Sequence, residues 1–124
     1  MASISVAEDA LAVTLTFREK LAAAHGDVSV ALAAVRRVQV EPDALAAVSG
    51  LRAPGLAIPG RTKIGVWRGH DSRRFVVARR GVPALSVTLE GARFDQLIIS
   101  TEHAAQLADQ IRAGAARVAD RVRL

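Results

Sequence analysis

Residues 63–100 read KIGVWRGHDSRRFVVARRGVPALSVTLEGARFDQLIIS, and this stretch decides the predicted fold. It contains four runs of strand-forming residues, each bounded by turn residues: Ile64–Arg68, Arg73–Arg79, Ala84–Glu90 and Asp95–Ser100. From Thr101 onward the spacing of the apolar residues changes from about two to about 3.6, which indicates an amphipathic helix. We therefore expect a meander of antiparallel strands that is closed by one C-terminal helix.

The residues before this stretch predict further strands and one short helix. Leu11–Phe17 alternates apolar and small or polar residues, as a half-buried strand does. Arg18–His25 is rich in helix-forming residues, so we expect a short helix inserted between the first two strands. Val28–Ala31 predicts the next strand, and Ala34–Val40 predicts another with a bulge or break near Arg36–Arg37.

The middle and the end of the chain contain breaker and capping signals. Pro42–Val48 predicts one or two helical turns, and the two Pro and two Gly residues of Ala53–Thr62 predict a loop. Ser100 or Thr101 is placed to cap the last helix. Gly114 weakens that helix, so we expect residues 113–124 to be its frayed end.

The length and composition predict one domain spanning residues 1–124, with 51% hydrophobic residues to fill its core. The chain has no cysteine, which excludes disulfides and thiolate metal sites. Its first residues lack the pattern of a signal peptide, and no run of 18 apolar residues is present. We expect a cytoplasmic protein with no cofactor and no metal.

The charge is unevenly distributed. The net charge is +5, and the segment from Arg52 to Arg80 holds eight basic residues and a single acid, Asp71. Such a segment favours anionic partners. The candidate binding residues are the basic side chains of the predicted hairpin and its one tryptophan: Trp67, Arg68, Arg73, Arg74, Arg79 and Arg80. For the arginines the alternative is a solvated or ion-paired face, and for Trp67 it is a core position.

Four segments resemble the pleckstrin-homology-like (PH-like) domain proteins of the uncharacterised actinobacterial type: Glu19–Val40 (EKLAAAHGDVSVALAAVRRVQV), Leu51–Trp67 (LRAPGLAIPGRTKIGVW), Arg74–Gly91 (RFVVARRGVPALSVTLEG) and Asp95–Ile111 (DQLIISTEHAAQLADQI). The resemblance implies a mainly β fold: a curved antiparallel barrel of about seven strands, closed at one end by the C-terminal helix. It also implies that the open end of the barrel can bind anionic lipid headgroups or peptides. Phe17–Val30 lacks the run of basic residues that lipid-specific members carry, so no binding residue is transferred.

The motifs for chemistry are weak. Gly55–Thr62 (GLAIPGRT) approaches a phosphate-binding loop, but Arg61 stands in place of the lysine and strand-forming residues follow it, so a turn is the better interpretation. His25, His70 and His103 are scattered along the sequence rather than spaced like metal ligands. No acid, base and nucleophile are expected to converge, so we predict that the protein is not an enzyme.

Two functional hypotheses follow from the sequence. The first is a non-enzymatic interaction module that binds a protein partner or a second copy, through the open end of the barrel or an exposed edge at Ala84–Leu89 and Gln96–Ile99. The second is peripheral binding to an anionic membrane or another polyanion through the arginine-rich hairpin. Nucleic acid is a disfavoured partner, because aromatic platforms and a basic recognition helix are both missing.

Overall fold

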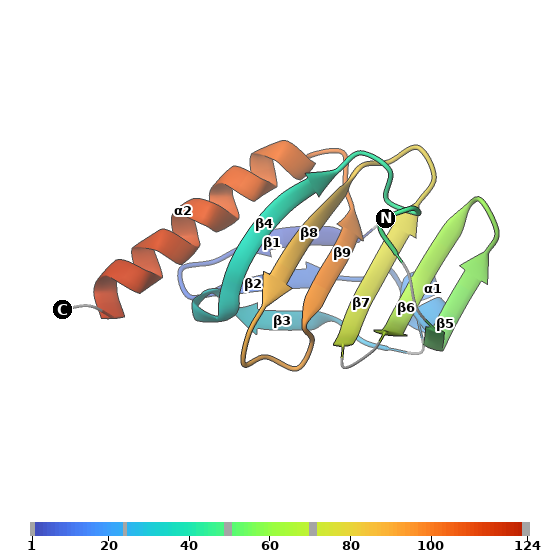
Figure 1. Ribbon diagram of the computed structural model, residues 1–124, viewed down its shortest axis with the longest axis horizontal. Helices are drawn as coiled ribbons and strands as arrows, with labels where there is room; N and C mark the ends of the chain where they lie inside the picture. The colour runs from blue at the N-terminus through green and yellow to red at the C-terminus, as the bar shows by residue number, and fades with distance from the viewer. Residues whose placement is uncertain (1, 24, 49–50, 70–71, 123–124) are drawn as a thin grey trace.

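The computed structural model describes residues 2–23, 25–48, 51–69 and 72–122 (Figure 1). These residues contain two α-helices, one 3-10 turn (η1, Leu32–Ala34) and nine strands. The strands are β1 (Ser3–Val6), β2 (Ala10–Thr14), β3 (Val28–Ala31), β4 (Val35–Glu41), β5 (Leu51–Ile58), β6 (Thr62–Gly69), β7 (Ser72–Arg79), β8 (Ala84–Leu89) and β9 (Gln96–Ser100). The helices are α1 (Phe17–Ala23) and α2 (Ala104–Val122). The prediction of a mainly β chain with a C-terminal helix is confirmed.

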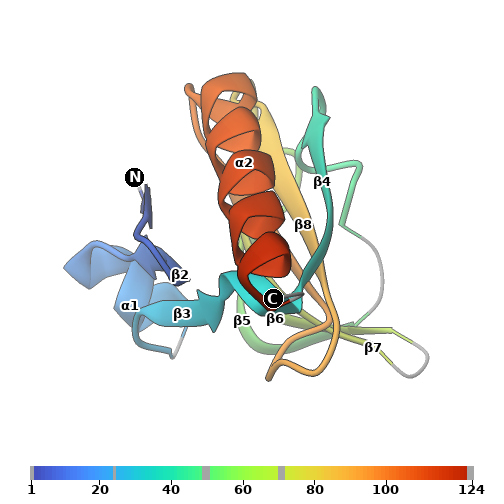
Figure 2. The same cartoon turned by 90° about the vertical axis from the view of Figure 1, so that its left-hand side faces the viewer.

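The strands form two sheets. The smaller is antiparallel with the order β1-β2-β3, and the larger has the order β4-β8-β9-β7-β6-β5. Figures 1 and 2 show the smaller sheet crossing one face of the larger one, with α2 lying beside both. We call the covered face of the larger sheet its inner face and the opposite face its outer face.

The prediction of a wholly antiparallel meander is wrong at one position. β9 lies between β7 and β8 and pairs parallel to β7, so the turn at residues 80–83 joins two strands that are not neighbours. Ser100 fixes this arrangement, because its Oγ accepts from the backbone N–H of Arg79 at 2.9 Å and donates to the carbonyl of Val82 at 3.1 Å. β9 is buried on both faces, as its unbroken Leu-Ile-Ile run requires of a central strand.

The predicted exposed edge at Ala84–Leu89 and Gln96–Ile99 is therefore also wrong. β8 is paired on both sides, by β4 and β9, and β9 is paired by β8 and β7. Among the described strands, the outermost ones of the larger sheet are β4 and β5, and those of the smaller sheet are β1 and β3.

The start of α1 differs from the prediction, and this difference places an aromatic side chain on the surface. Thr16 and Glu19 form a capping box, in which the backbone N–H of Glu19 donates to Thr16 Oγ1 at 3.2 Å and the N–H of Thr16 donates to Glu19 Oε1 at 3.0 Å. The helix thus begins at Phe17, which was expected to end a strand on its buried face. Phe17 is instead 74% exposed.

β4 agrees with its prediction, whereas the segment Ala53–Thr62 differs from it. β4 has a register shift between Val35 and Arg37, which confirms the expected irregularity. The loop expected at Ala53–Thr62 is wrong for most of its length, because β5 runs to Ile58 and the turn is confined to residues 59–61. Gly55 permits this pairing, since its φ is 151° and a Cβ there would collide with the backbone of Ile64.

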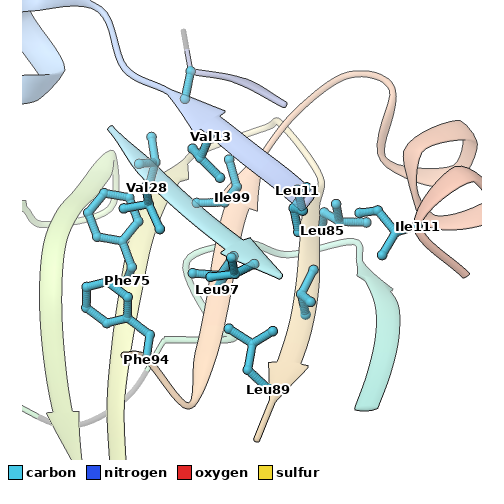
Figure 3. Packing of buried hydrophobic residues seen from close by; sticks show 14 of the residues in the cluster. Leu11, Val13, Val28, Phe75, Leu85, Leu89, Phe94, Leu97, Ile99 and Ile111 are labelled. Atoms are coloured by element: carbon cyan, nitrogen blue, oxygen red, sulfur yellow. The ribbon is translucent and has the colours of Figure 1, made fainter. Parts of the chain in front are cut away.

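The main core lies between the inner face, the smaller sheet and the two helices. Figure 3 shows Leu11, Val13 and Val28 of the smaller sheet over Phe75, Leu97 and Ile99 of the larger one. α2 is continuous to Val122 and packs closely at Gly114, where a Cβ would lie 3.0 Å from Leu32 Cδ1. A smaller cluster on the outer face joins Trp67, Val76, Ala78, Ala84 and Ile98 to Ala44 and Val48 of the turn before β5.

Candidate functional site

The six candidate residues of the hairpin do not gather at one place. Because side chains alternate along β7, Arg73 and Arg79 point to the inner face and Arg74 to the outer face. Arg79 lies six positions after Arg73 along β7, which corresponds to roughly 20 Å. Arg80 is exposed just beyond the end of β7, so the arginines do not share one environment.

Arg68 and Arg73 lie opposite each other near the hairpin that joins β6 and β7. Arg68 is exposed, whereas the Arg73 guanidinium lies 5.1 Å from the centre of the Phe94 ring. The Arg93 guanidinium lies 5.6 Å from the same ring. Both guanidinium groups thus lie within cation–π distance of the Phe94 ring.

Trp67 and Arg74 lie on the outer face and are buried. Trp67 is 4% exposed and belongs to the cluster beneath the turn before β5. Lys63 fastens that turn, because its Nζ donates to the carbonyls of Leu45 at 3.2 Å and Val48 at 3.1 Å. The Trp67 ring therefore packs in a core position and does not form a surface platform for stacking.

Arg79 forms an ion pair with the buried carboxylate of Glu19. Glu19 is 1% exposed, and its Oε2 accepts from Arg79 Nη2 at 2.9 Å and from the backbone N–H of Ala2 at 3.1 Å. Burial on its own raises the pKa of Glu19, but the hydrogen bonds from the Thr16 backbone and from Arg79, together with the attraction of nearby positive charges, outweigh it. The pKa of Glu19 is consequently lowered, and the carboxylate is held ionised inside the protein.

β1 has backbone N–H and C=O groups that pair with no described strand. In the β1–β2 pair, the backbone N–H of Ala7 donates to the carbonyl of Ala10 at 2.8 Å, and Val6, Ser5 and Ile4 follow in register opposite Leu11, Ala12 and Val13. Hydrogen-bonded and non-hydrogen-bonded pairs alternate along an antiparallel ladder. The N–H and C=O groups of Ile4 and Val6 therefore point away from β2.

Two hollows lie along this edge, between β1 and α2. One hollow of about 510 Å³ lies between Ala2–Ile4 and the start of α2, and a second of about 570 Å³ lies between Val6–Glu8 and the middle of α2. Gln110 lines both hollows. The α2 residues that line the groove lie on one stripe of the helix: Gln106, Leu107, Gln110, Ala113 and Arg117. We call this feature the β1–α2 groove.

A second surface feature gathers apolar side chains. Of the five large apolar side chains that are exposed among the described residues, four belong to α1 and β5. They are Phe17 and Leu21 on α1, and Leu56 and Ile58 on β5. We call these four residues the α1–β5 surface. The capping box Thr16–Glu19 is the sequence signal that would have placed Phe17 on a helix.

The weaker motifs hold no assembled chemistry in the described parts of the chain. His25 packs against Phe75 and Phe94, with ring centroids at 5.1 and 5.8 Å, while His103 is exposed and His70 lies outside the described residues. The GLAIPGRT segment forms the β5–β6 hairpin, so it lacks the helix that a phosphate loop requires. Among the described residues no group of three or more His, Cys, Asp or Glu side chains is placed to hold a metal ion.

Neither described helix is long and apolar enough to cross a membrane. No protein-family model, no curated protein and no solved structure matches this chain.

Proposed function

We propose that this protein is a non-enzymatic interaction module that binds an extended segment of a partner protein in the β1–α2 groove. The observation that carries this proposal is the free edge of β1, which borders the two hollows of the groove at Ser3–Ile4 and at Val6. A peptide that adds a strand to such an edge gains main-chain hydrogen bonds for affinity, and neighbouring side chains give specificity. We also propose that this chain is related to the PH-like domain proteins. The C-terminal helix supports it, while the parallel β7–β9 pair departs from it.

The sequence of β1 suits this role. Ser3-Ile4-Ser5-Val6 carries no charge and no proline, the two devices with which sheet edges usually prevent pairing. Ile4 and Val6 pack partly against the core, which fixes the strand in place, while their outward N–H and C=O groups are available. The amide side chains of Gln106 and Gln110 stand across the groove and can pair with a bound backbone.

The alternative, peripheral binding to an anionic membrane or polyanion through the arginine-rich hairpin, has less support. Its five arginines do not gather at one place, and Arg79 is already paired with Glu19. Under this alternative, binding to phosphatidylserine vesicles would fall steeply between about 50 and 300 mM salt, because screening shortens the reach of exposed charges.

The proposal is tested with peptides selected from a random display library on the immobilised protein. Ile4→Pro removes the outward N–H of β1 without removing a hydrogen bond to β2, and Ile4→Ala removes the same side chain but keeps that N–H. We expect Ile4→Pro to weaken binding of the selected peptides by about tenfold relative to Ile4→Ala, the effect of one lost hydrogen bond. Equal affinities of the two variants would place the peptides elsewhere. Far-ultraviolet circular dichroism establishes that both variants are folded.

A further inference from the structure

We infer that the α1–β5 surface binds an acidic amphipathic helix of a partner protein. This surface is separate from the β1–α2 groove, since the two share no lining residue. The inference therefore rests on observations of its own and does not depend on the proposed function.

Two residues of the surface, Leu56 and Ile58, line a hollow. Phe17 and Leu21 are 74% and 67% exposed, and they stand one turn apart on α1. A hollow of about 210 Å³ opens between the Arg18–Ala22 side of α1 and the β5–β6 hairpin, with Ala22, Leu56, Ile58 and Ile64 among its walls. Projecting apolar side chains next to a concave apolar site are the features that a partner helix uses for its anchor residues.

The charges around the surface specify the sign of the partner. Arg18, Arg61 and Arg80 are exposed, and none of them forms an ion pair with an acidic residue among those the structure describes. Arg61 and Arg80 are held together, because the backbone N–H of Arg80 donates to the carbonyl of Arg61 at 2.8 Å. Two acids that contact residues of α1 or β7 are already paired: Glu19 with Arg79, and Asp27 with Lys20.

This surplus of positive charge argues against a second copy as the occupant. A symmetric contact between two such surfaces would bring the same arginines together, and like charges facing each other across an interface are unfavourable. Carboxylates on a partner would instead pair with the guanidinium groups in a bidentate manner. The complementary partner is therefore apolar on one side and acidic around it.

The hollow favours a protein helix over a lipid surface. Its floor is formed in part by Glu19 and Arg79, which are already paired, so the remaining open space is bounded mainly by apolar side chains. A bulky side chain of a helix can fill this space, whereas a bilayer surface is flat on the scale of one side chain. The i, i+4 ridge of Phe17 and Leu21 also matches the groove of a facing helix.

The test uses fluorescence anisotropy with a labelled synthetic helix that carries Leu and Phe on one face and Glu on the other. A second peptide has every Glu replaced by Gln. We expect the Glu peptide to bind at least about tenfold more tightly than the Gln peptide. Leu21→Ser and Arg61→Glu should each weaken binding of the Glu peptide by about tenfold. The matched controls Val40→Ser and Arg37→Glu change an exposed apolar and an exposed basic residue on β4 and should leave binding unchanged.

Three results would overturn the inference. The first is that the Glu and Gln peptides bind with equal affinity. The second is that Leu21→Ser binds the Glu peptide as tightly as the wild type does. The third is that the Glu peptide does not bind, while the protein binds phosphatidylserine vesicles in a manner that requires Leu21. The last result would assign the surface to membranes. Ile4→Pro should bind the Glu peptide like the wild type, so failure here and failure at the β1–α2 groove are distinguishable.

Discussion

Replacement of Glu19 by alanine is the most informative perturbation of the fold. Glu19 is 1% exposed and accepts hydrogen bonds from the backbone of Ala2, the backbone of Thr16 and the side chain of Arg79. Glu19→Ala leaves all three donors without this acceptor. Because the carboxylate joins the N-terminal segment, α1 and β7, we expect the whole domain to lose stability together.

The expected loss of stability in Glu19→Ala follows from the burial of the two charges. Removing one partner of a fully buried ion pair costs about 3–5 kcal/mol. The Arg79 side chain is 32% exposed, so water can hydrate it after the substitution. We therefore expect Glu19→Ala to lower the free energy of unfolding by about 3 kcal/mol, the lower end of that range. Glu19→Gln keeps one acceptor oxygen and should cost about half as much.

Urea unfolding at pH 7, followed by the fluorescence of the buried Trp67, measures both values. Arg79→Ala and the double variant complete a thermodynamic cycle, in which we expect a favourable coupling of about 1–2 kcal/mol between Glu19 and Arg79. A loss below about 0.5 kcal/mol for Glu19→Ala would refute the reasoning, because exposed residues show effects of that size.

Three further predictions concern pH, the β5 hairpin and the core. The pKa of Glu19 is lowered from 4.5, so its stabilising effect is present above pH 4.5 and is lost as the pH falls through the folded-state pKa. The urea concentration at the unfolding midpoint should therefore decrease when the pH is lowered below 4.5, and it should decrease less in Glu19→Gln. Gly55→Ala should cost about 2 kcal/mol or more in urea unfolding, because its φ of 151° and the adjacent Ile64 backbone both oppose a Cβ, whereas Gly60→Ala, with open space around it, should cost less. Phe75→Ala should cost about 3–5 kcal/mol, visible as a much lower melting temperature by circular dichroism, because Phe75 is fully buried against Phe94 and His25; a small shift would mean that this cluster does not support the fold.

Local elements could be predicted from the sequence because their signals are local. Val28–Ala31 alternates cleanly and forms β3 with those bounds, and the broken alternation near Arg36 corresponds to the register shift in β4. The stripe of apolar residues after Thr101 forms α2. Periodicity determines which face of an element is buried, so these elements needed no knowledge of their neighbours.

The pairing of strands could not be predicted in the same way. Apolar periodicity does not encode which strand lies beside which, and a short turn such as residues 80–83 suggests a hairpin although β9 separates β7 from β8. The unbroken apolar run of β9 is typical of a central strand, yet we expected an exposed edge at Gln96–Ile99, and the run does not reveal its partners.

The candidate sites could not be predicted either, because they also depend on contacts between residues that are distant in sequence. The arginines of β7 are close in sequence, yet alternation places Arg74 on the face opposite to Arg73 and Arg79. Glu19 and Arg79 are 60 residues apart, and no local pattern links them. The free edge of β1 depends on the order of the smaller sheet, which its four residues do not reveal.

Amide hydrogen exchange at β1 tests the central claim most directly. In the free protein, the N–H groups of Ile4 and Val6 should exchange faster than that of Ser5, which points to β2. When a peptide selected on the immobilised protein is added, we expect exchange at Ile4 and Val6 to slow markedly while that of Ser5 changes little. Unchanged exchange at Ile4 and Val6 in the bound state would contradict strand addition at this edge.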